Sequence, residues 1–212
     1  MLSTPLTAPG RLPDAVRLRA HGPGDIGWII SRHGALYARE YGWDLRFEAL
    51  VARIAADFID RFDATREACW IAERTGTDGV PERLGCVVLV QARDDATGAI
   101  DPGVAQLRLL LVEPAARGLG VGRRLVAECT RFARDAGQTS LRLWTQSNLV
   151  AARAIYQREG YRLVGTEPHH SFGHALVGEI WDMPLVPAAA VGPVDRSTGA
   201  PAPQATRRPD DR

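Results

Sequence analysis

The chain has 212 residues, of which 45% are hydrophobic and 24% charged, a balance typical of a soluble globular protein with one sizeable core. Its 26 lysines and arginines against 25 aspartates and glutamates leave a formal charge of +1, which excludes the broad basic surface expected for binding nucleic acid or an anionic membrane. The N-terminus has no basic segment followed by an apolar core, and no apolar run reaches about 18 residues, so we expect a cytoplasmic protein without a membrane span.

Three cysteines, Cys69, Cys86 and Cys129, lie far apart, with neither a CxxC pair nor a partnering series of histidines. This spacing predicts neither a disulfide framework nor a zinc site. We interpret them as small core residues in a reducing compartment and expect no metal.

Hydrophobic periodicity predicts most of the secondary structure. Alternating or continuous apolar runs predict strands over residues 15–19, 69–74, 84–90, 107–112, 140–145, 161–165 and 179–185. Helical spacing predicts helices over 26–37, 47–62, 122–136 and 148–159. We expect residue 25 to cap the first helix, and exposed loops over 93–103 and 166–178. Proline-rich composition predicts a loose lead over 1–13 and a disordered tail over 187–212.

A glycine-rich turn lies between the strand that stops at Pro114 and the helix that begins near Gly122. The start of a helix exposes unpaired N–H groups and the positive end of its dipole, which together favour an anion. Gly118, Gly120 and Gly122 let an anion approach the backbone closely, and Arg117 adds positive charge. The turn therefore predicts an anion site, with a ligand-free turn as the alternative.

Two common nucleotide motifs do not fit this turn. A Walker-type loop needs Gly-Lys-Ser/Thr, whereas Gly122 is followed by two arginines, Arg123 and Arg124. A dinucleotide fingerprint needs its third glycine where Arg123 stands. Both are excluded by spacing.

The pattern Arg-x-x-Gly-x-Gly at 117–122, preceded by Val112-Glu113-Pro114, resembles the pyrophosphate motif of the GCN5-related N-acetyltransferases, the GNAT family. A second segment, from Asn148 through Tyr156 to Gly160-Tyr161, resembles the family's other motif and lies one predicted strand further on. Residues 31–34 and 169–174 also resemble the acetyltransferase half of bacterial fusions to a MarR-type regulator, although we expect no winged-helix half in this chain.

The resemblance implies a GNAT fold over residues 14–186, of the α/β (α+β) class. A central mixed, largely antiparallel sheet of about seven strands would be flanked by about four helices. The order of the predicted elements agrees with this arrangement.

The resemblance also implies acetyl-CoA as cosubstrate. Its pyrophosphate would lie on the glycine turn and its pantetheine arm along the strand that ends at Val112, paired like an added strand. A bulge expected at 110–112 would aim an N–H at the thioester oxygen. The implied cofactor-binding residues are Leu110, Leu111, Val112, Arg117, Gly118, Leu119, Gly120, Val121, Gly122, Arg123, Asn148 and Ala151.

Tyr156 falls where the family's general acid lies. A phenol of pKa about 10 is a weaker acid than a thiol near 8.5, so we expect Tyr156 to stabilise the leaving sulfur first by hydrogen bonding. Its alternative role is that of a core residue over the sheet.

The implied acceptor is a primary amine on a small molecule or a protein, and a homodimer is a further expected partner. Candidate acceptor-site residues are His33, Tyr37, Trp43, Glu73, Trp144, His170 and His174, with Tyr41 and Asp44 nearby in the helix break. The general base is left open between Glu73, His170, His174 and a water relay. His33 has a second possible role, as a satisfied core histidine.

Two other functions compete with N-acetyl transfer. A degenerate family member would bind acyl-CoA as a sensor without catalysis, and a structural or partner-binding domain would act through its tail and would not bind coenzyme A. The presence of both Asn148 and Tyr156 argues against degeneracy, because a sensor needs the glycine turn but no acid.

Overall fold

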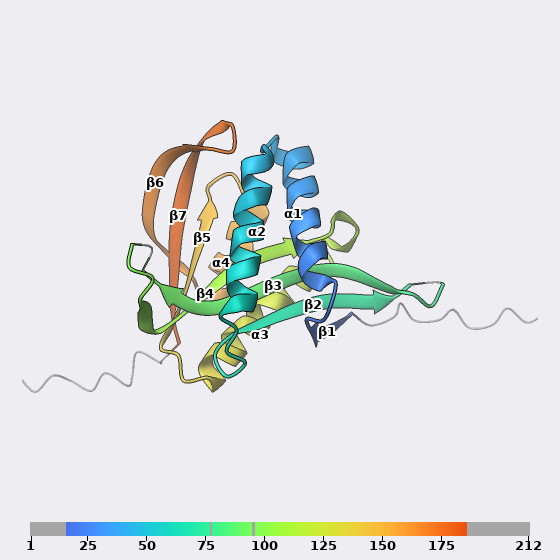
Figure 1. The fold of residues 1–212 in the computed structure, drawn as a ribbon, viewed down its shortest axis with the longest axis horizontal. Helices are drawn as coiled ribbons and strands as arrows, with labels where there is room; N and C mark the ends of the chain where they lie inside the picture. The colour runs from blue at the N-terminus through green and yellow to red at the C-terminus, as the bar shows by residue number, and fades with distance from the viewer. Residues whose placement is uncertain (1–15, 77, 95, 186–212) are drawn as a thin grey trace, which may run out of the picture.

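The computed structural model describes residues 16–185 apart from 77 and 95 (Figure 1). Its strands are β1 (Arg17–Ala20), β2 (Ala68–Thr75), β3 (Pro81–Arg93), β4 (Ile100–Val112), β5 (Ser140–Gln146), β6 (Arg162–Ser171) and β7 (His174–Pro184). Its helices are α1 (Asp25–Tyr41), α2 (Leu45–Asp60), the 3₁₀ turn η1 (Pro114–Ala116), α3 (Val121–Asp135) and α4 (Val150–Glu159). The predicted lead and tail lie outside the described residues, so the expected domain limits stay predictions.

The strands form one seven-stranded sheet in the order β1-β2-β3-β4-β5-β7-β6. Among the described strands, β4 and β5 pair in parallel, and every other pair of neighbours is antiparallel. The expected fold, a mixed and largely antiparallel sheet with four α-helices, is confirmed.

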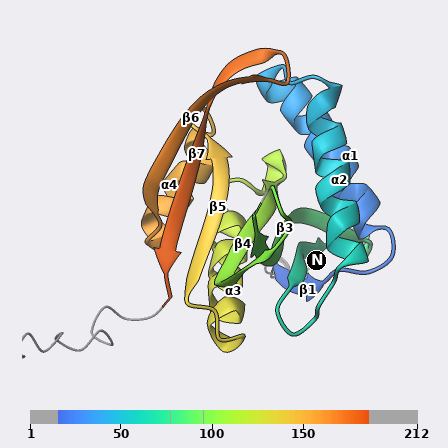
Figure 2. The same cartoon turned by 60° about the vertical axis from the view of Figure 1, so that its left-hand side comes forward.

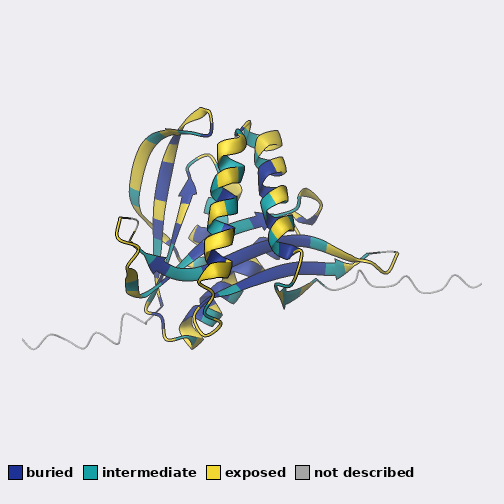
Figure 3. Ribbon diagram, in the orientation of Figure 1, coloured by how far each residue is buried: buried dark blue, intermediate teal, exposed yellow. Residues whose placement is uncertain are grey.

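Helices cover both faces of the sheet (Figure 1). On one face, buried residues of α3 and Tyr156 of α4 pack against the sheet together with Leu141 and Leu143 of β5. On the other face, Ile29 and Leu36 of α1 and Phe58 of α2 pack against strands β2 to β4. Figure 3 shows the buried central strands and the exposed outer faces of the helices.

A bulge reverses the alternation of β4 near its end. The register with β3 passes from Val88↔Arg108 to Cys86↔Leu111, so β4 holds one extra residue, and Leu109 has a φ of 50°. Residues four positions apart on a regular strand point to the same face of the sheet. Because of the bulge, Leu107 packs on the α3 side and Leu111 packs on the α1 side. The bulge lies at Leu109–Leu110, at the start of the region in which it was expected.

The two parallel strands separate beyond this bulge. Their pairing runs from Val104↔Ser140 to Leu107↔Leu143, and no further pair joins the later described residues of β4 and β5. The end of β4 therefore leaves backbone groups on the β5 side free of sheet pairing, as a chain added between the strands would require.

The predicted loop over residues 166–178 is wrong. β6 and β7 continue through it as a hairpin whose two-residue turn is Phe172-Gly173, with φ of 55° and 86°. A turn with positive φ at both positions matches the twist of the two strands that it joins. Such turns usually have the sequence Asn-Gly, so the sequence Phe-Gly does not predict a hairpin here. The hairpin bends over to meet the turn between α1 and α2, where Phe172 packs on Trp43 (Figure 2).

Three smaller predictions also need correction. The loop over 93–103 is shorter, because β3 extends to Arg93 and β4 begins at Ile100. Gly24, not Asp25, caps α1, since the Asp25 carboxylate is drawn into ion pairs with arginines. Asn148 lies in the turn before α4, whose cap is Leu149.

Candidate functional site

The main cavity of the described chain has a volume of about 1020 Å³ and lies where β4 and β5 separate. Walls come from α1 and α2, from the β3–β4 hairpin, from α4 and from β6 and β7. Apolar and aromatic side chains dominate the wall, with several arginine and aspartate side chains between them. The predicted site residues in this wall are His33, Tyr37, Trp43, Leu110, Trp144 and Tyr156.

The glycine turn has the geometry of an anion site at two of its three glycines. Gly118 and Gly120 have φ of 80° and 75°, and a Cβ built on either would meet nothing within 4 Å. Gly120 caps α3 and provides no side-chain partner for the first N–H groups of the helix. These donors and the helix dipole favour an anion there.

The third glycine has a different role. Gly122 is buried in α3, and a Cβ on it would lie 2.8 Å from Ile155 Cδ1 and 3.3 Å from Val112 Cγ2. Its lack of a side chain lets α3 pack closely against α4 and the end of β4. Val121 is buried beside it, whereas Leu119 is 55% exposed.

Two predicted cofactor-binding arginines flank the turn, and each is paired with a carboxylate. Arg117 donates to both oxygens of Glu40 on α1, at 2.9 and 2.8 Å. Arg123 on α3 donates to Glu159 on α4 at 2.8 Å. Both guanidinium groups remain largely exposed, so a bound diphosphate would compete with these carboxylates.

Tyr156 lies on α4 and is 4% exposed, with its ring both in the core and in the cavity wall. Burial raises the pKa of its phenol, and the nearby Tyr37 adds to that rise. The phenol therefore remains protonated at neutral pH and is able to donate a hydrogen bond. The two roles weighed for Tyr156, acid and core residue, are compatible in this position.

The end of β4 and the start of α4 hold the other predicted cofactor residues. Leu111 packs in the α1-side core, and Val112 packs against the α3-side core. Asn148 and Ala151 are exposed, and neither lines the main cavity. Their proposed contacts with a cofactor stay predictions.

An aromatic group from α1, α2 and the hairpin closes one end of the cavity. Tyr37 lies between Trp43 and Phe47, with ring centroids 5.1 and 4.6 Å away, and Phe172 contacts the latter two. Tyr41 packs on the outside of this group, and Asp44 caps α2 by accepting from Arg46 N. Neither Tyr41 nor Asp44 lines the cavity.

His33 is 2% exposed and stacks on Tyr37. Its Nδ1 lies 2.8 Å from Ile29 O, and Nε2 has no partner within the described chain. Burial lowers the pKa of His33 to about 4, although the hydrogen bond to Ile29 opposes this. The ring is thus neutral at pH 7, with Nδ1 as the donor and Nε2 as an open acceptor.

The hairpin histidines are not brought into the cavity. His170 is exposed on β6, and His174 Nε2 donates to Gly42 O, in the turn between α1 and α2, at 3.0 Å. That contact requires a protonated Nε2, since a carbonyl only accepts. His174 thereby helps to hold the hairpin on the α1–α2 turn.

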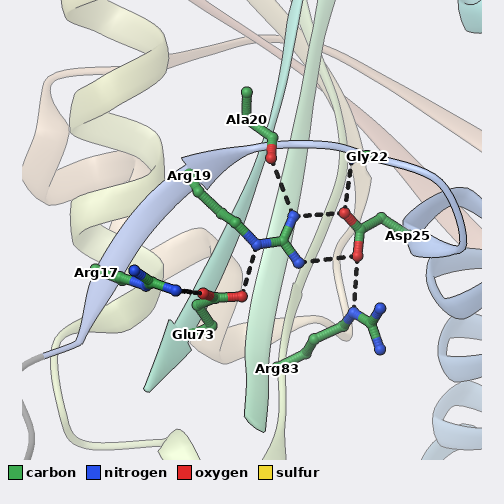
Figure 4. A network of polar contacts seen from close by, with 7 residues as sticks. All are labelled: Arg17, Arg19, Ala20, Gly22, Asp25, Glu73 and Arg83. Atoms are coloured by element: carbon green, nitrogen blue, oxygen red, sulfur yellow. Dashed lines mark hydrogen bonds and ion pairs between the residues drawn. The ribbon is translucent and has the colours of Figure 1, made fainter. Parts of the chain in front are cut away.

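Glu73 lies outside the main cavity, in a network that joins β1, β2 and α1 (Figure 4). Its oxygens accept from Arg17 at 2.8 Å and from Arg19 at 2.6 Å, and Arg19 also donates to the buried Asp25. Burial opposes ionisation of Glu73, but the two arginines lower its pKa. Such a carboxylate is poorly suited to act as a base, and the structure does not bring it together with Tyr156.

Sequence analysis missed several residues of the cavity wall. Gln146 follows Trp144 by two positions on β5 and therefore lies on the same face of the sheet. Since Trp144 was a candidate site residue, this spacing was the one feature of the sequence that pointed to Gln146. Arg142 lies two positions earlier on that face and pairs with Asp182 at 3.0 Å and Asp101 at 3.3 Å. No local pattern distinguishes these residues from the solvated face of a strand.

Among the described residues, no group of three or more histidine, cysteine or acidic side chains is arranged to hold a metal ion. Within the same ranges, no helix has the length and apolarity needed to cross a membrane. The expected absence of a metal and the cytoplasmic location stay predictions.

Solved structures share this fold. The protein yncA of Salmonella typhimurium, determined with its cofactor acetyl-CoA, superimposes with a TM-score of 0.65 over 83% of this chain and 97% of its own, at 18% identity. A GCN5-related N-acetyltransferase from Kribbella flavida gives a TM-score of 0.61 over 80% of this chain and 98% of its own, at 22% identity. These likenesses define the class: an α/β protein with a GNAT-type sheet opened between two parallel strands.

The family model described as "Acetyltransferase (GNAT) family" matches residues 35–161, which include both sequence motifs. The chain belongs to the GNAT acetyltransferase family. The family resemblance predicted from the motifs at 117–122 and 148–161 is confirmed.

Curated relatives include several mycothiol acetyltransferases. That of Acidothermus cellulolyticus is 27% identical over 81% of this chain and 52% of its own length. That of Sanguibacter keddieii is 30% identical over 75% of this chain and 48% of its own length. The chain therefore spans about half the length of these relatives. The resemblance to the acetyltransferase half of MarR fusions stays a prediction.

Proposed function

We propose that this chain transfers the acetyl group of acetyl-CoA directly to a primary amine. One observation carries the proposal: the open glycine turn at the start of α3 lies at the end of the same strand, β4, whose bulge lines the main cavity. A ligand with a diphosphate at one end and a thioester at the other matches this arrangement.

The residues present fit the coenzyme at both ends. The left-handed Gly118 and Gly120 leave open space beside the N–H groups of α3, and Arg117 lies next to them. Beyond Leu107, the unpaired edge of β4 offers backbone groups to the amides of a pantetheine arm. Acetyl-CoA would supply the thioester, and the remaining chemistry belongs to the chain.

The bulge and Tyr156 divide the catalytic work. The register between β3 and β4 shifts at Leu109–Leu110. In this proposal a backbone N–H of the bulge holds the thioester oxygen as negative charge develops on it. The protonated phenol of Tyr156 then donates a hydrogen bond to the departing sulfur. The acceptor nitrogen forms the new bond to carbon, and its proton leaves to water or to a group in the cavity.

The acceptor enters from the α1–α2 side in this proposal. The cavity wall there carries aromatic rings, and the strands opposite add arginine and aspartate side chains, a combination that suits a small polar amine. The curated relatives named mycothiol acetyltransferases support a small-molecule acceptor, with a protein amine as the alternative. A homodimer in the cytoplasm remains part of the proposal.

The experiment is an assay of free thiol released from acetyl-CoA in the presence of a panel of primary amines, coupled to calorimetry with coenzyme A. Amine-dependent thiol release supports the enzyme. Binding of coenzyme A without release on any amine would favour the sensor, and absence of binding would overturn both.

A further inference from the structure

Gln146 lies on the acceptor side of the sheet. Along β5, Leu141 and Leu143 pack with α3, so the intervening residues project to the opposite face, beneath α1 and α2. Trp144 and Gln146 accordingly line the main cavity. Gly178 on the paired strand β7 makes room for this arrangement, since a Cβ there would lie 2.9 Å from Trp144 Nε1.

A chain of hydrogen bonds from the hairpin orients the amide of Gln146. His169 Nδ1 lies 2.9 Å from Ser171 Oγ, and His169 Nε2 lies 3.1 Å from Gln146 Oε1. With the Ser171 hydroxyl donating to Nδ1, the Nε2–H of His169 donates to Oε1. The indole of Trp144 packs 5.7 Å from the same histidine ring and holds it in place.

This orientation leaves the NH₂ group of Gln146 without a partner. The residue is 1% exposed, and Nε2 has no hydrogen-bond partner in the described chain. A buried polar group that is left unpaired destabilises the fold, and a bound ligand that supplies an acceptor would remove that penalty. Two other cavity-lining residues carry buried unpaired atoms, Nε2 of His33 on α1 and Nε1 of Trp43 in the turn between α1 and α2.

We propose that the Gln146 amide is a specificity determinant that donates a hydrogen bond to an oxygen of the acceptor. The substrate class is a small amine that carries a carbonyl, carboxylate or hydroxyl oxygen close to its amino group. The inference rests on the proposed function, because it places the amine in the same cavity. The oxygen belongs to the acceptor rather than to the thioester, since Gln146 shares its face with Trp144 and Arg142 and not with Tyr156.

The test compares amines of similar size with and without an oxygen: glycinamide, glycine and ethanolamine against propylamine. Wild type, Gln146→Leu and Gln146→Glu are assayed on each by thiol release, and the variant-to-wild-type ratio of kcat/KM is taken for the same amine. Differences in amine pKa cancel in that ratio. Gln157→Leu, an exposed glutamine on α4 outside the cavity wall, is the matched control.

For at least one oxygen-bearing amine, Gln146→Leu lowers kcat/KM by about tenfold to a hundredfold, mainly through KM, while propylamine changes by less than about threefold. Gln146→Glu retains the size of the side chain but replaces the donor with a carboxylate, and it fails on glycine, whose carboxylate oxygens only accept hydrogen bonds. Equal losses on all four amines, or a Glu variant that keeps the wild-type preference for glycine over propylamine, would overturn the inference.

Binding separates this inference from the proposed function. The same amines are titrated into protein saturated with coenzyme A and followed by NMR, so no turnover is needed. Oxygen-bearing amines bind more tightly than propylamine to wild type, and this difference disappears in Gln146→Leu. If no amine is acetylated yet this pattern holds, the proposed function fails and the inference stands. If amines are acetylated but neither binding nor turnover depends on the oxygen, the inference fails alone.

Discussion

The guanidinium of Arg117 donates from a single nitrogen, Nη2, to both carboxylate oxygens of Glu40, at 2.9 and 2.8 Å. A second pair, Arg32 with Glu113 at 2.6 and 2.7 Å, joins the same helix to the residue that follows β4. Helix α1 is thus tied by two ion pairs to the segment that carries the glycine turn. Because α1 also lines the main cavity, the anion site and the acceptor side share one supporting element.

The first prediction follows from the competition between Glu40 and a diphosphate for Arg117. Glu40→Gln frees the guanidinium and removes a nearby negative charge, so coenzyme A binds about twofold to fivefold more tightly, the range expected for an exposed ion pair. Arg117→Ala has the opposite effect. Calorimetry at low and high salt measures both, with a smaller gain at high salt.

The control for this prediction is Glu128→Gln, which breaks an exposed pair with Arg131 on α3, outside the cavity wall. It leaves the affinity for coenzyme A unchanged. Weaker binding in Glu40→Gln would mean that Glu40 positions Arg117 rather than competes for it.

The second prediction concerns Tyr156. Tyr156→Phe retains the buried ring and loses only the hydroxyl, so kcat falls about 10²–10⁴-fold while the affinity for coenzyme A is kept. Since burial raises the pKa of this phenol, wild-type activity shows no loss from its ionisation at or below pH 10. Steady-state kinetics across pH 6–10 provides the measurement.

Tyr161→Phe is the matched control, because Tyr161 is also buried and lies 5.7 Å from the Tyr156 ring but does not line the cavity. Its kcat stays within about threefold of wild type. Comparable losses in the two variants would assign Tyr156 to packing alone.

Local signals in the sequence account for much of the fold. Single residues with a strong backbone preference set several boundaries. Helix α1 ends at Gly42, β4 ends before Pro114, and α3 begins after Gly120. Periodicity predicts the buried faces because it records which residues a helix or strand turns toward its neighbours. The family motif adds the order of the elements, which the structure confirms.

The features that the residues alone do not predict depend on contacts between distant segments. The bulge at Leu109 reverses which side of β4 is buried; the family resemblance implied a bulge at 110–112, but the run of leucines itself gives no hint of it. Phe172 adopts a positive φ so that its ring reaches Trp43, a residue from the other end of the chain. Gln146 acquires its role only when His169 reaches it across the β7 strand.

The third prediction is a pH dependence of stability from Asp25. Burial raises the pKa of this carboxyl, but hydrogen bonds from Arg19, Gly22 N–H and Arg83 outweigh it and lower the pKa to about 2. A depressed pKa stabilises the fold above the unfolded value near 4, and this contribution is lost as the pH falls toward 2. Denaturant unfolding measures the free energy of unfolding of wild type and of Asp25→Asn. The difference between the two proteins becomes smaller by about 2 kcal/mol from pH 5 to pH 2.

Asp135→Asn is the control for Asp25, since Asp135 lies on the exposed surface of α3 in a pair with Arg131. The difference in the free energy of unfolding between Asp135→Asn and wild type changes by less than about 0.5 kcal/mol over the same pH range. A gap for Asp25→Asn that is constant with pH would show that its carboxylate is not held by the arginines.

The last prediction is that alanine has opposite effects on stability at two exposed glycines, because their backbone φ angles differ. Gly27 lies inside α1 without a positive φ, and a Cβ there meets nothing within 4 Å, so Gly27→Ala raises the free energy of unfolding by about 0.5–1 kcal/mol. Gly120 has equally open space but a φ of 75°, so Gly120→Ala lowers that free energy by about 1–2 kcal/mol. The alanine also crowds the start of α3 and weakens coenzyme A binding, whereas Gly27→Ala leaves it unchanged. Urea unfolding and calorimetry on the two variants test both effects, and a Gly120→Ala protein that binds coenzyme A as wild type does would remove the glycine turn from the anion site.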